Sequence, residues 1–166
     1  MNPKLKWTLI GLGVVVIGAQ AIRPDRTNPP YDESATITAQ SDVPADVAAL
    51  IERSCTDCHS HRTEWPWYSN VAPASWLVAY HADHGRDYVN FDRWADYSPY
   101  ERQDAFDEIA RVVGNGEMPL PIYLPLHPEA ELSDAERERL VEWAKNERDR
   151  VREEIRASGQ SRSPRR

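Results

Sequence analysis

The stretch that decides the fold is Cys55-Thr56-Asp57-Cys58-His59, because it contains both cysteines of the 166-residue chain. Two cysteines form at most one disulfide, which excludes a small scaffold held together by several disulfides. Two thiols separated by two residues and followed directly by a histidine are typical of covalent c-type haem attachment. The motif therefore predicts a small domain built around one haem.

The chemistry of such a motif assigns a role to each of its three functional side chains. The thiols of Cys55 and Cys58 add to the two vinyl groups of haem, and His59 ligates the iron from the proximal side. We expect one covalent haem c per chain. Three alternatives are possible for the same residues. A thioredoxin-like redox site needs a preceding strand. A zinc site that also uses His61 would have unusually crowded ligands, and a plain disulfide would close a very tight loop.

An electron-transferring haem needs a sixth iron ligand, and Met118 is the predicted one. It is the only methionine after the initiator, and it lies in the loop Gly114-Asn115-Gly116-Glu117-Met118-Pro119-Leu120. A thioether ligand raises the reduction potential of haem. Two alternatives remain open: Met118 fills a gap in the core, or His127 takes its place as the iron ligand.

The N-terminus predicts export. Two lysines precede an uncharged run over residues 7–22, which Arg23 ends. The run is longer than the apolar part of most signal peptides and shorter than most spanning helices. Residues 1–22 are therefore expected to be a signal peptide, cleaved near Ala19-Gln20-Ala21, or a membrane anchor. In either case the rest of the chain lies on the periplasmic side of the cytoplasmic membrane.

The remaining chain divides into three parts. Residues 23–42 are rich in proline and polar side chains and predict an extended tether. Residues 43–157 are expected to form the haem-binding domain, and residues 158–166 a disordered basic tail. No segment alternates with a period of two, so the expected fold class is all-α: a cytochrome-c-like domain whose helices and long loops wrap the haem.

Start signals predict four helices in the exported part. Proline is favoured in the first turn of a helix, and a Ser-x-x-Glu capping box marks a helix start. The first expected helix begins at Pro44, is capped by Ser41 or Asp42, and leads to Cys55. The second runs from near Pro73 to about His84, with Gly85 near its end. The third runs from Ser98-Pro99-Tyr100-Glu101 to Gly114 or Gly116, and the fourth begins at Ser133-Asp134-Ala135-Glu136.

Net charge excludes one class of partner. The chain has 20 basic and 27 acidic residues, a formal charge of −7, and without residues 1–21 it has 18 basic residues and a charge of −9. A strongly basic nucleic-acid binder is therefore not expected. The acidic surface favours solubility and could steer a basic partner. The expected partners are a redox protein, whose identity the sequence does not give, and the cytoplasmic membrane through the N-terminal segment.

Several longer motifs follow the cysteines in order, and together they resemble the bacterial haem-binding domain family with a single CxxCHS motif. The resemblance covers roughly residues 23–148 and implies a cytochrome-c-like domain with covalent haem, often behind an N-terminal membrane segment. Glu64 stands where the family usually has asparagine, which we interpret as a surface change. The matching motifs are Cys55-Thr56-Asp57-Cys58-His59-Ser60, Glu64-Trp65-Pro66-Trp67-Tyr68-Ser69, Val71-Ala72-Pro73-Ala74-Ser75-Trp76-Leu77, Asn90-Phe91 with Trp94, Glu117-Met118-Pro119-Leu120 with Tyr123, and Leu126-His127-Pro128.

These observations favour one-electron transfer by iron rather than the turnover of a substrate. No general acid–base pair or nucleophile stands out, so an enzyme is not predicted. Two alternatives remain. One is a haem-based sensor or ligand-binding module with an open sixth site. The other is a peroxidase-like enzyme in which His127 or Glu117 serves as the acid–base residue.

Overall fold

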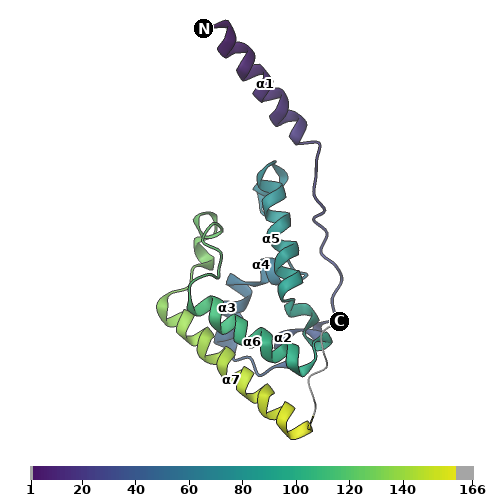
Figure 1. Cartoon of the computed structure of the whole chain (residues 1–166), viewed down its shortest axis with the longest axis vertical. Coiled ribbons are helices and arrows are strands. Elements are labelled where there is room, and N and C mark those ends of the chain that lie inside the picture. Colours follow the sequence, from purple (N-terminus) through teal and green to yellow (C-terminus); the bar gives the residue numbers. More distant parts are fainter. Residues whose placement is uncertain (1, 160–166) are drawn as a thin grey trace.

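Helices joined by loops make up the computed structural model, which describes residues 2–159 (Figure 1). Among these residues there are seven α-helices and no strand, so the predicted all-α fold is confirmed. The α-helices are α1 (Pro3–Ala19), α2 (Ile37–Gln40), α3 (Ala45–Ser54), α4 (Thr56–His59), α5 (Ala74–Tyr88), α6 (Pro99–Gly114) and α7 (Asp134–Ser158). Short 3₁₀ helices cover Glu33–Ala35, Trp67–Asn70, Phe91–Asp96, Leu124–Leu126 and Pro128–Ala130.

The core forms where α6 and α7 pack together. Phe106 of α6 is fully buried and meets two indole rings edge to face, with ring centroids 4.9 Å from Trp94 and 5.5 Å from Trp143. The apolar face of α3, which includes Val47 and Ile51, joins the same core. Because α3 is held there, the chain that leaves it has a fixed starting point, and the next residue is Cys55.

Both capping boxes form as the sequence predicted. The backbone N–H of Glu101 donates to Ser98 Oγ and that of Glu136 to Ser133 Oγ, each at 3.3 Å. Each glutamate accepts a hydrogen bond from its serine N–H in return. Helix α6 ends at Gly114, and α7 continues to Ser158. Residues 160–166, most of the predicted basic tail, lie outside the described residues.

Two helix ends differ from the predictions. Helix α3 begins at Ala45 and has no side-chain cap, so the predicted cap from Ser41 or Asp42 was wrong. The backbone carbonyl of Asp42 instead accepts a hydrogen bond from Trp143 Nε1 at 3.0 Å. Helix α5 runs past Gly85 to Tyr88. Gly85 does not end the helix; it allows the backbone of Cys58 to approach α5 closely.

The predicted tether over residues 23–42 is extended only in its first half. From Glu33 the chain turns into a 3₁₀ helix and then α2, and Ile37 lies in the core with 2% of its surface exposed. The side chain of Asp32 starts this turn by accepting from the backbone N–H of Ser34 at 2.9 Å. Burial of Ile37 outweighs the extended preference of the surrounding residues, so the second half belongs to the domain.

Helix α1 stands away from the rest of the chain, and none of its 17 residues is buried (Figure 1). Within residues 2–159, no helix meets the length and apolarity needed to cross a membrane.

The aromatic core predicts a large effect for one substitution. Phe106→Ala should lower the free energy of unfolding by about 3–5 kcal/mol, because it removes a buried ring and leaves a cavity between two indoles. Urea unfolding followed by circular dichroism measures this. Tyr88→Ala removes a ring that is 83% exposed and serves as the control, with an expected change within about 0.5 kcal/mol. Equal effects of the two substitutions would contradict the described core.

Candidate functional site

The CxxCH motif forms a separate helical turn directly after α3. Cys55 leaves the helical conformation at φ −131° and ψ −34°, and α4 follows with Thr56 as its first residue. The carbonyl oxygen of Cys55 accepts from the backbone N–H groups of Cys58 at 3.2 Å and His59 at 3.0 Å. Both cysteines are half-buried free thiols. The turn therefore brings the two thiols and the histidine together at the end of a helix anchored in the core.

Burial makes both thiols weak acids. It raises the pKa of Cys55 to about 12, and the charge of Cys58 raises it further. Burial also raises the pKa of Cys58 to about 11; Asp57 adds to this shift, and Arg86 opposes it. Dithiol redox sites depend on a lowered cysteine pKa. The thioredoxin-like alternative therefore finds no support in the surroundings of the motif.

His59 is held in the form that binds metal. Its Nδ1 lies 3.1 Å from the carbonyl oxygen of Val89, which can only accept, so Nδ1 carries the proton and Nε2 keeps its lone pair. Burial lowers the pKa of His59, while hydrogen bonds to the backbone of Val89 and Gly85 act in the opposite direction. A histidine ligand oriented through its other ring nitrogen is a general feature of metal sites. His59 is thus prepared to ligate an iron through Nε2.

His61, two residues later, has both ring nitrogens engaged. Nε2 accepts from Asn90 Nδ2 at 2.8 Å, and Nδ1 donates to the carbonyl oxygen of Pro30 at 3.2 Å. The part of the chain that the structure describes contains no group of three or more His, Cys, Asp or Glu side chains suited to a metal ion. The zinc alternative, which required His61, therefore lacks its fourth ligand.

A buried carboxylate fixes the chain directly after the motif. Asp92 has only 2% of its surface exposed and accepts from the backbone N–H of His61 at 2.9 Å and from Arg62 Nε at 3.2 Å. Arg62 also pairs with Glu52 of α3 at 2.9 Å. Removing one partner of a buried ion pair is strongly destabilising. This network ties the turn after His59 to both α3 and the segment that follows α5.

Helix α5 lies against the motif at Gly85. A Cβ atom at this position would overlap the carbonyl oxygen of Cys58 and would lie 2.8 Å from its carbonyl carbon. Only glycine lets the two backbones approach this closely. The next residue, Arg86, donates to the carbonyl oxygen of Ser60 and to Thr63 Oγ1, each at 2.8 Å. Close approach and hydrogen bonds together clamp the motif onto α5.

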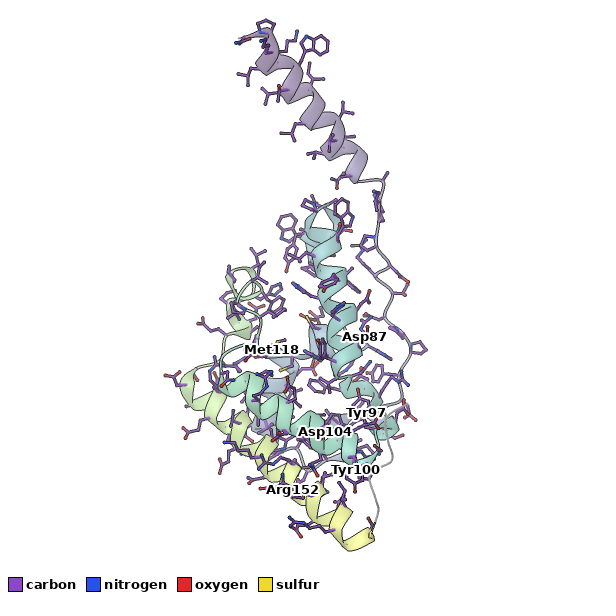
Figure 2. All side chains as sticks on the ribbon, in the orientation of Figure 1. Asp87, Tyr97, Tyr100, Asp104, Met118 and Arg152 are labelled. Atoms are coloured by element: carbon purple, nitrogen blue, oxygen red, sulfur yellow. The ribbon has the colours of Figure 1, made fainter. Side chains whose placement is uncertain are left out.

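Met118 lies in the turn that ends α6, near the middle of the molecule (Figure 2). Gly116 adopts φ +73°, and the backbone N–H of Met118 donates to the carbonyl oxygen of Val112 at 3.1 Å. Arg137 of α7 donates to the carbonyl oxygens of Val113 and Met118. The half-buried Met118 and Cys55 pack against the same apolar core. The loop backbone that carries the predicted sixth ligand is therefore fixed from two helices.

His127, the alternative ligand, also has both ring nitrogens engaged. Tyr68 Oη lies 2.6 Å from Nε2, Glu129 Oε1 lies 3.0 Å from Nδ1, and the ring stacks on Tyr123 with centroids 3.9 Å apart. Ligation of iron by His127 would break at least one of these hydrogen bonds. The described conformation therefore favours Met118 over His127.

A hydrogen bond joins the loop after Met118 to the CxxCH motif. Tyr123 Oη donates to Asp57 Oδ2 at 2.8 Å, and the other oxygen of Asp57 accepts from the backbone N–H of Glu64 at 2.8 Å. Burial, followed by the bond to Asp57, raises the pKa of Tyr123, so its phenol stays a donor. Sequence reasoning missed this contact. Its only signal was the tyrosine that accompanies the Met-Pro-Leu motif.

Two buried indole N–H groups lack a hydrogen-bond partner within the described residues: those of Trp65 and Trp94. A buried donor without an acceptor is costly, and each case calls for an explanation. Trp94 lies in the aromatic core, whereas Trp65 follows the motif by six residues. A haem carboxylate is a suitable acceptor for Trp65. With two free thiols, an available His59 Nε2 and this unpaired donor, the residues present fit a covalently bound haem.

The fold and the motif define a small helical haem-binding module. The chain belongs to the haem-binding domain family, whose model matches residues 14–146. Comparison with curated proteins and with solved structures found no match. The family match confirms the resemblance derived from the motifs, and it begins inside α1, earlier than residue 23.

The close approach at Gly85 gives a second prediction. Gly85→Ala should lower the free energy of unfolding by about 1–3 kcal/mol, because the added methyl group forces α4 and α5 apart. Urea unfolding and the visible spectrum of the haem-loaded protein measure this. Gly114→Ala is the matched control, since its Cβ would meet Val141 at an ordinary 3.6 Å. The control should leave stability unchanged or raise it by about 0.5 kcal/mol. A stable, spectrally normal Gly85→Ala protein would refute the clamp.

Proposed function

We propose that this protein carries one haem c, bound covalently through Cys55 and Cys58, and transfers single electrons. The observation that supports this most directly is the hydrogen bond from His59 Nδ1 to Val89, which leaves Nε2 unprotonated next to two free thiols. Membership of the haem-binding domain family supports the cofactor. When bound, the haem supplies the one-electron chemistry of its iron.

Each residue then has a defined task. Cys55 and Cys58 would hold the haem in place, and His59 and Met118 would ligate its iron. The Trp65 indole N–H would donate to a haem carboxylate, which would satisfy a donor that otherwise has no partner among the described residues. The apolar core against which Met118 and Cys55 pack keeps water away and favours the less charged, reduced state of the iron.

Contacts at His127 and Glu117 favour a carrier over a peroxidase-like enzyme. His127 is engaged by Tyr68 and Glu129, and Glu117, the other acid–base candidate, pairs with Arg111 at 2.8 Å. Neither side chain is free to move a proton at an open iron site without breaking these bonds. A sensor or ligand-binding module with an open sixth site is the remaining alternative, and Met118 decides between it and the carrier.

We further propose that the domain works on the periplasmic side of the cytoplasmic membrane and that α1, although shorter than a membrane-spanning helix, stays attached as its anchor. The uncharged run over residues 7–22 and the absence of any buried residue in α1 support this. Retention also keeps Gln20, whose side chain exchanges two hydrogen bonds with the backbone of Ala72. Cleavage after Ala21 would remove that contact.

Covalent attachment predicts a stain that survives denaturation. Wild-type protein expressed with a haem-attachment system should retain haem on a denaturing gel, because thioether bonds do not dissociate when the protein unfolds. The double variant Cys55→Ser, Cys58→Ser should lose it. Thr56→Ser keeps a hydroxyl within the motif and is the matched control that should stain as wild type. Equal staining of the double variant, or none in wild type, would reject the attachment.

Ligation by Met118 predicts a spectroscopic change. Wild type should contain low-spin iron with a thioether charge-transfer band, and Met118→Ala should lose the band, bind CO and have a lower reduction potential. The comparison variant His127→Gln should keep the band. Loss of the low-spin spectrum in His127→Gln alone would assign the ligand to His127. High-spin iron that binds CO in wild type would favour the sensor.

A further inference from the structure

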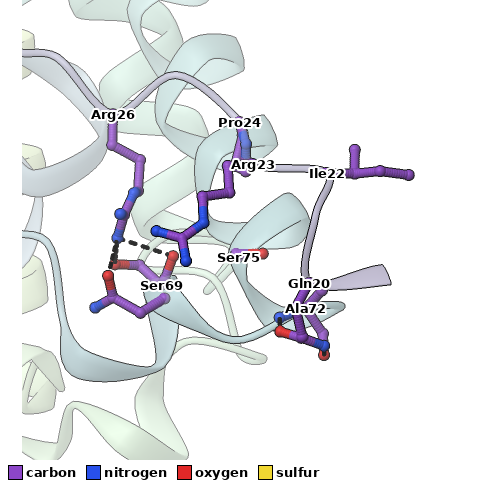
Figure 3. Close-up of a pocket in the computed structure, with 9 residues that line it drawn as sticks. Gln20, Ile22, Arg23, Pro24, Arg26, Ser69, Ala72 and Ser75 are labelled. Atoms are coloured by element: carbon purple, nitrogen blue, oxygen red, sulfur yellow. Dashed lines mark hydrogen bonds between the residues drawn. The ribbon is translucent and has the colours of Figure 1, made fainter. Parts of the chain in front are cut away.

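Residues 20–30, which we call the strap, lie along the surface of the domain and are hydrogen-bonded to it (Figure 3). At its start, Gln20 Oε1 accepts from the backbone N–H of Ala72 at 2.9 Å, and its Nε2 donates to the carbonyl oxygen of Ala72 at 3.3 Å. Two residues later, the carbonyl oxygen of Ile22 accepts from Trp76 Nε1 at 2.8 Å. The strap is therefore docked from its first residue.

The contacts continue along the strap. Arg26 Nη1 donates to the carbonyl oxygen of Ser69 at 3.0 Å and to Asn70 Oδ1 at 2.8 Å. Asn28 Nδ2 donates to the carbonyl oxygen of Thr63 at 2.9 Å. A strap held at Ala72, Ser69 and Thr63 does not behave as a flexible spacer between α1 and the domain.

This docking restricts where the domain sits. Helix α1 ends at Ala19, and the next residue is already bonded to Ala72, at the start of α5. No free length of chain remains between the two. Any surface that holds α1 must therefore also lie next to this corner of the domain, and Figure 1 shows the start of α5 at the end of the domain nearest α1.

The corner presents apolar side chains to solvent. Trp67 is 77% exposed and Ile22 is 66% exposed, and Figure 3 shows Ile22 pointing away from the domain. We call the corner patch the exposed side chains Ile22, Trp67, Val71, Trp76 and Leu77. Contiguous exposed apolar residues mark a binding surface, and tryptophan is enriched where proteins meet the lipid headgroups.

Charge singles out the same corner. The chain is 28% charged and acidic overall, yet residues 65–80 contain no charged side chain and no histidine. The strap has two exposed charges, Arg23 and Asp25, and Arg23 is the one adjacent to Ile22. An anionic lipid surface would repel most of this acidic domain but not this corner.

We infer that the corner patch rests in the headgroup layer of the bilayer that holds α1, so that the domain is fixed against the membrane instead of swinging on a tether. The inference relies on the proposed membrane location of α1. The indole rings and Leu77 enter the headgroup region, and the strap sets the distance. Helix α7, which carries eight acidic and seven basic side chains, lies on the side away from the lipid (Figure 1).

Photo-crosslinking tests the inference. Full-length haem-loaded protein is reconstituted in phospholipid nanodiscs that contain a diazirine-labelled lipid, and the adducts are located by mass spectrometry. We expect adducts in α1 and in residues 67–77. Tyr88, 83% exposed at the other end of α5, should remain unlabelled.

Matched variants sharpen the test. Gln20→Ala combined with Arg26→Ala releases the strap and should reduce adducts in residues 67–77 about tenfold, while α1 stays labelled, because a freed tether lowers the local concentration of lipid at the patch. Trp67→Ser should reduce labelling of the patch, and Tyr88→Ser should not change it.

Three results would overturn the inference. Adducts in α1 alone would mean that the domain is free of the lipid. Absence of adducts throughout would mean that α1 is not in the bilayer. Crosslinks between residues 67–77 of two chains, sought on parallel samples with a protein–protein crosslinker, would assign the patch to a second copy of this protein. A haem stain on the same samples tests the proposed covalent haem separately. Lipid labelling of a protein that does not stain would refute the haem proposal and leave the membrane inference standing.

Discussion

The close contact between Gly85 and Cys58 is the constraint on which the site depends. Helix α4 has four residues, far too few to be stable alone. It keeps its shape because α3 holds it from one end and α5 lies against its backbone. The same approach brings the end of α5, and with it the Val89 carbonyl, to His59. A side chain at position 85 would separate the helices and take the acceptor away from the histidine.

Much of this architecture was predictable from local sequence signals. The capping boxes at Ser98 and Ser133 define the starts of α6 and α7, since a serine and a glutamate three residues apart satisfy the same backbone groups in nearly any context. The CxxCH motif and the single available methionine identified the candidate residues directly. These signals depend only on residues close together in the sequence, so they can be recognised without the tertiary structure.

What the sequence did not disclose depends on distant partners. Ile37 is buried although its neighbours favour an extended chain, because the core offers it a place. Gly85 resembles a helix end in the sequence and is in fact a packing position. Asn28, Arg26 and Gln20 read as polar residues of a linker, yet each meets a specific backbone group more than 30 residues away. Neither hydrophobic periodicity nor a capping motif predicts contacts of this kind.

Asp57 shows that the two middle residues of the motif do more than set a spacing. One of its oxygens holds the chain after the motif through Glu64, and the other holds the loop after Met118 through Tyr123. The two ends of the proposed iron site are thus joined through Asp57, which is neither a thiol nor a proposed iron ligand. A CxxCH segment from another protein without an aspartate at this position would keep both cysteines and the histidine but lose the hydrogen bonds to Glu64 and Tyr123. Motif and loop form one structural unit, and an exchange between such domains has to move both together.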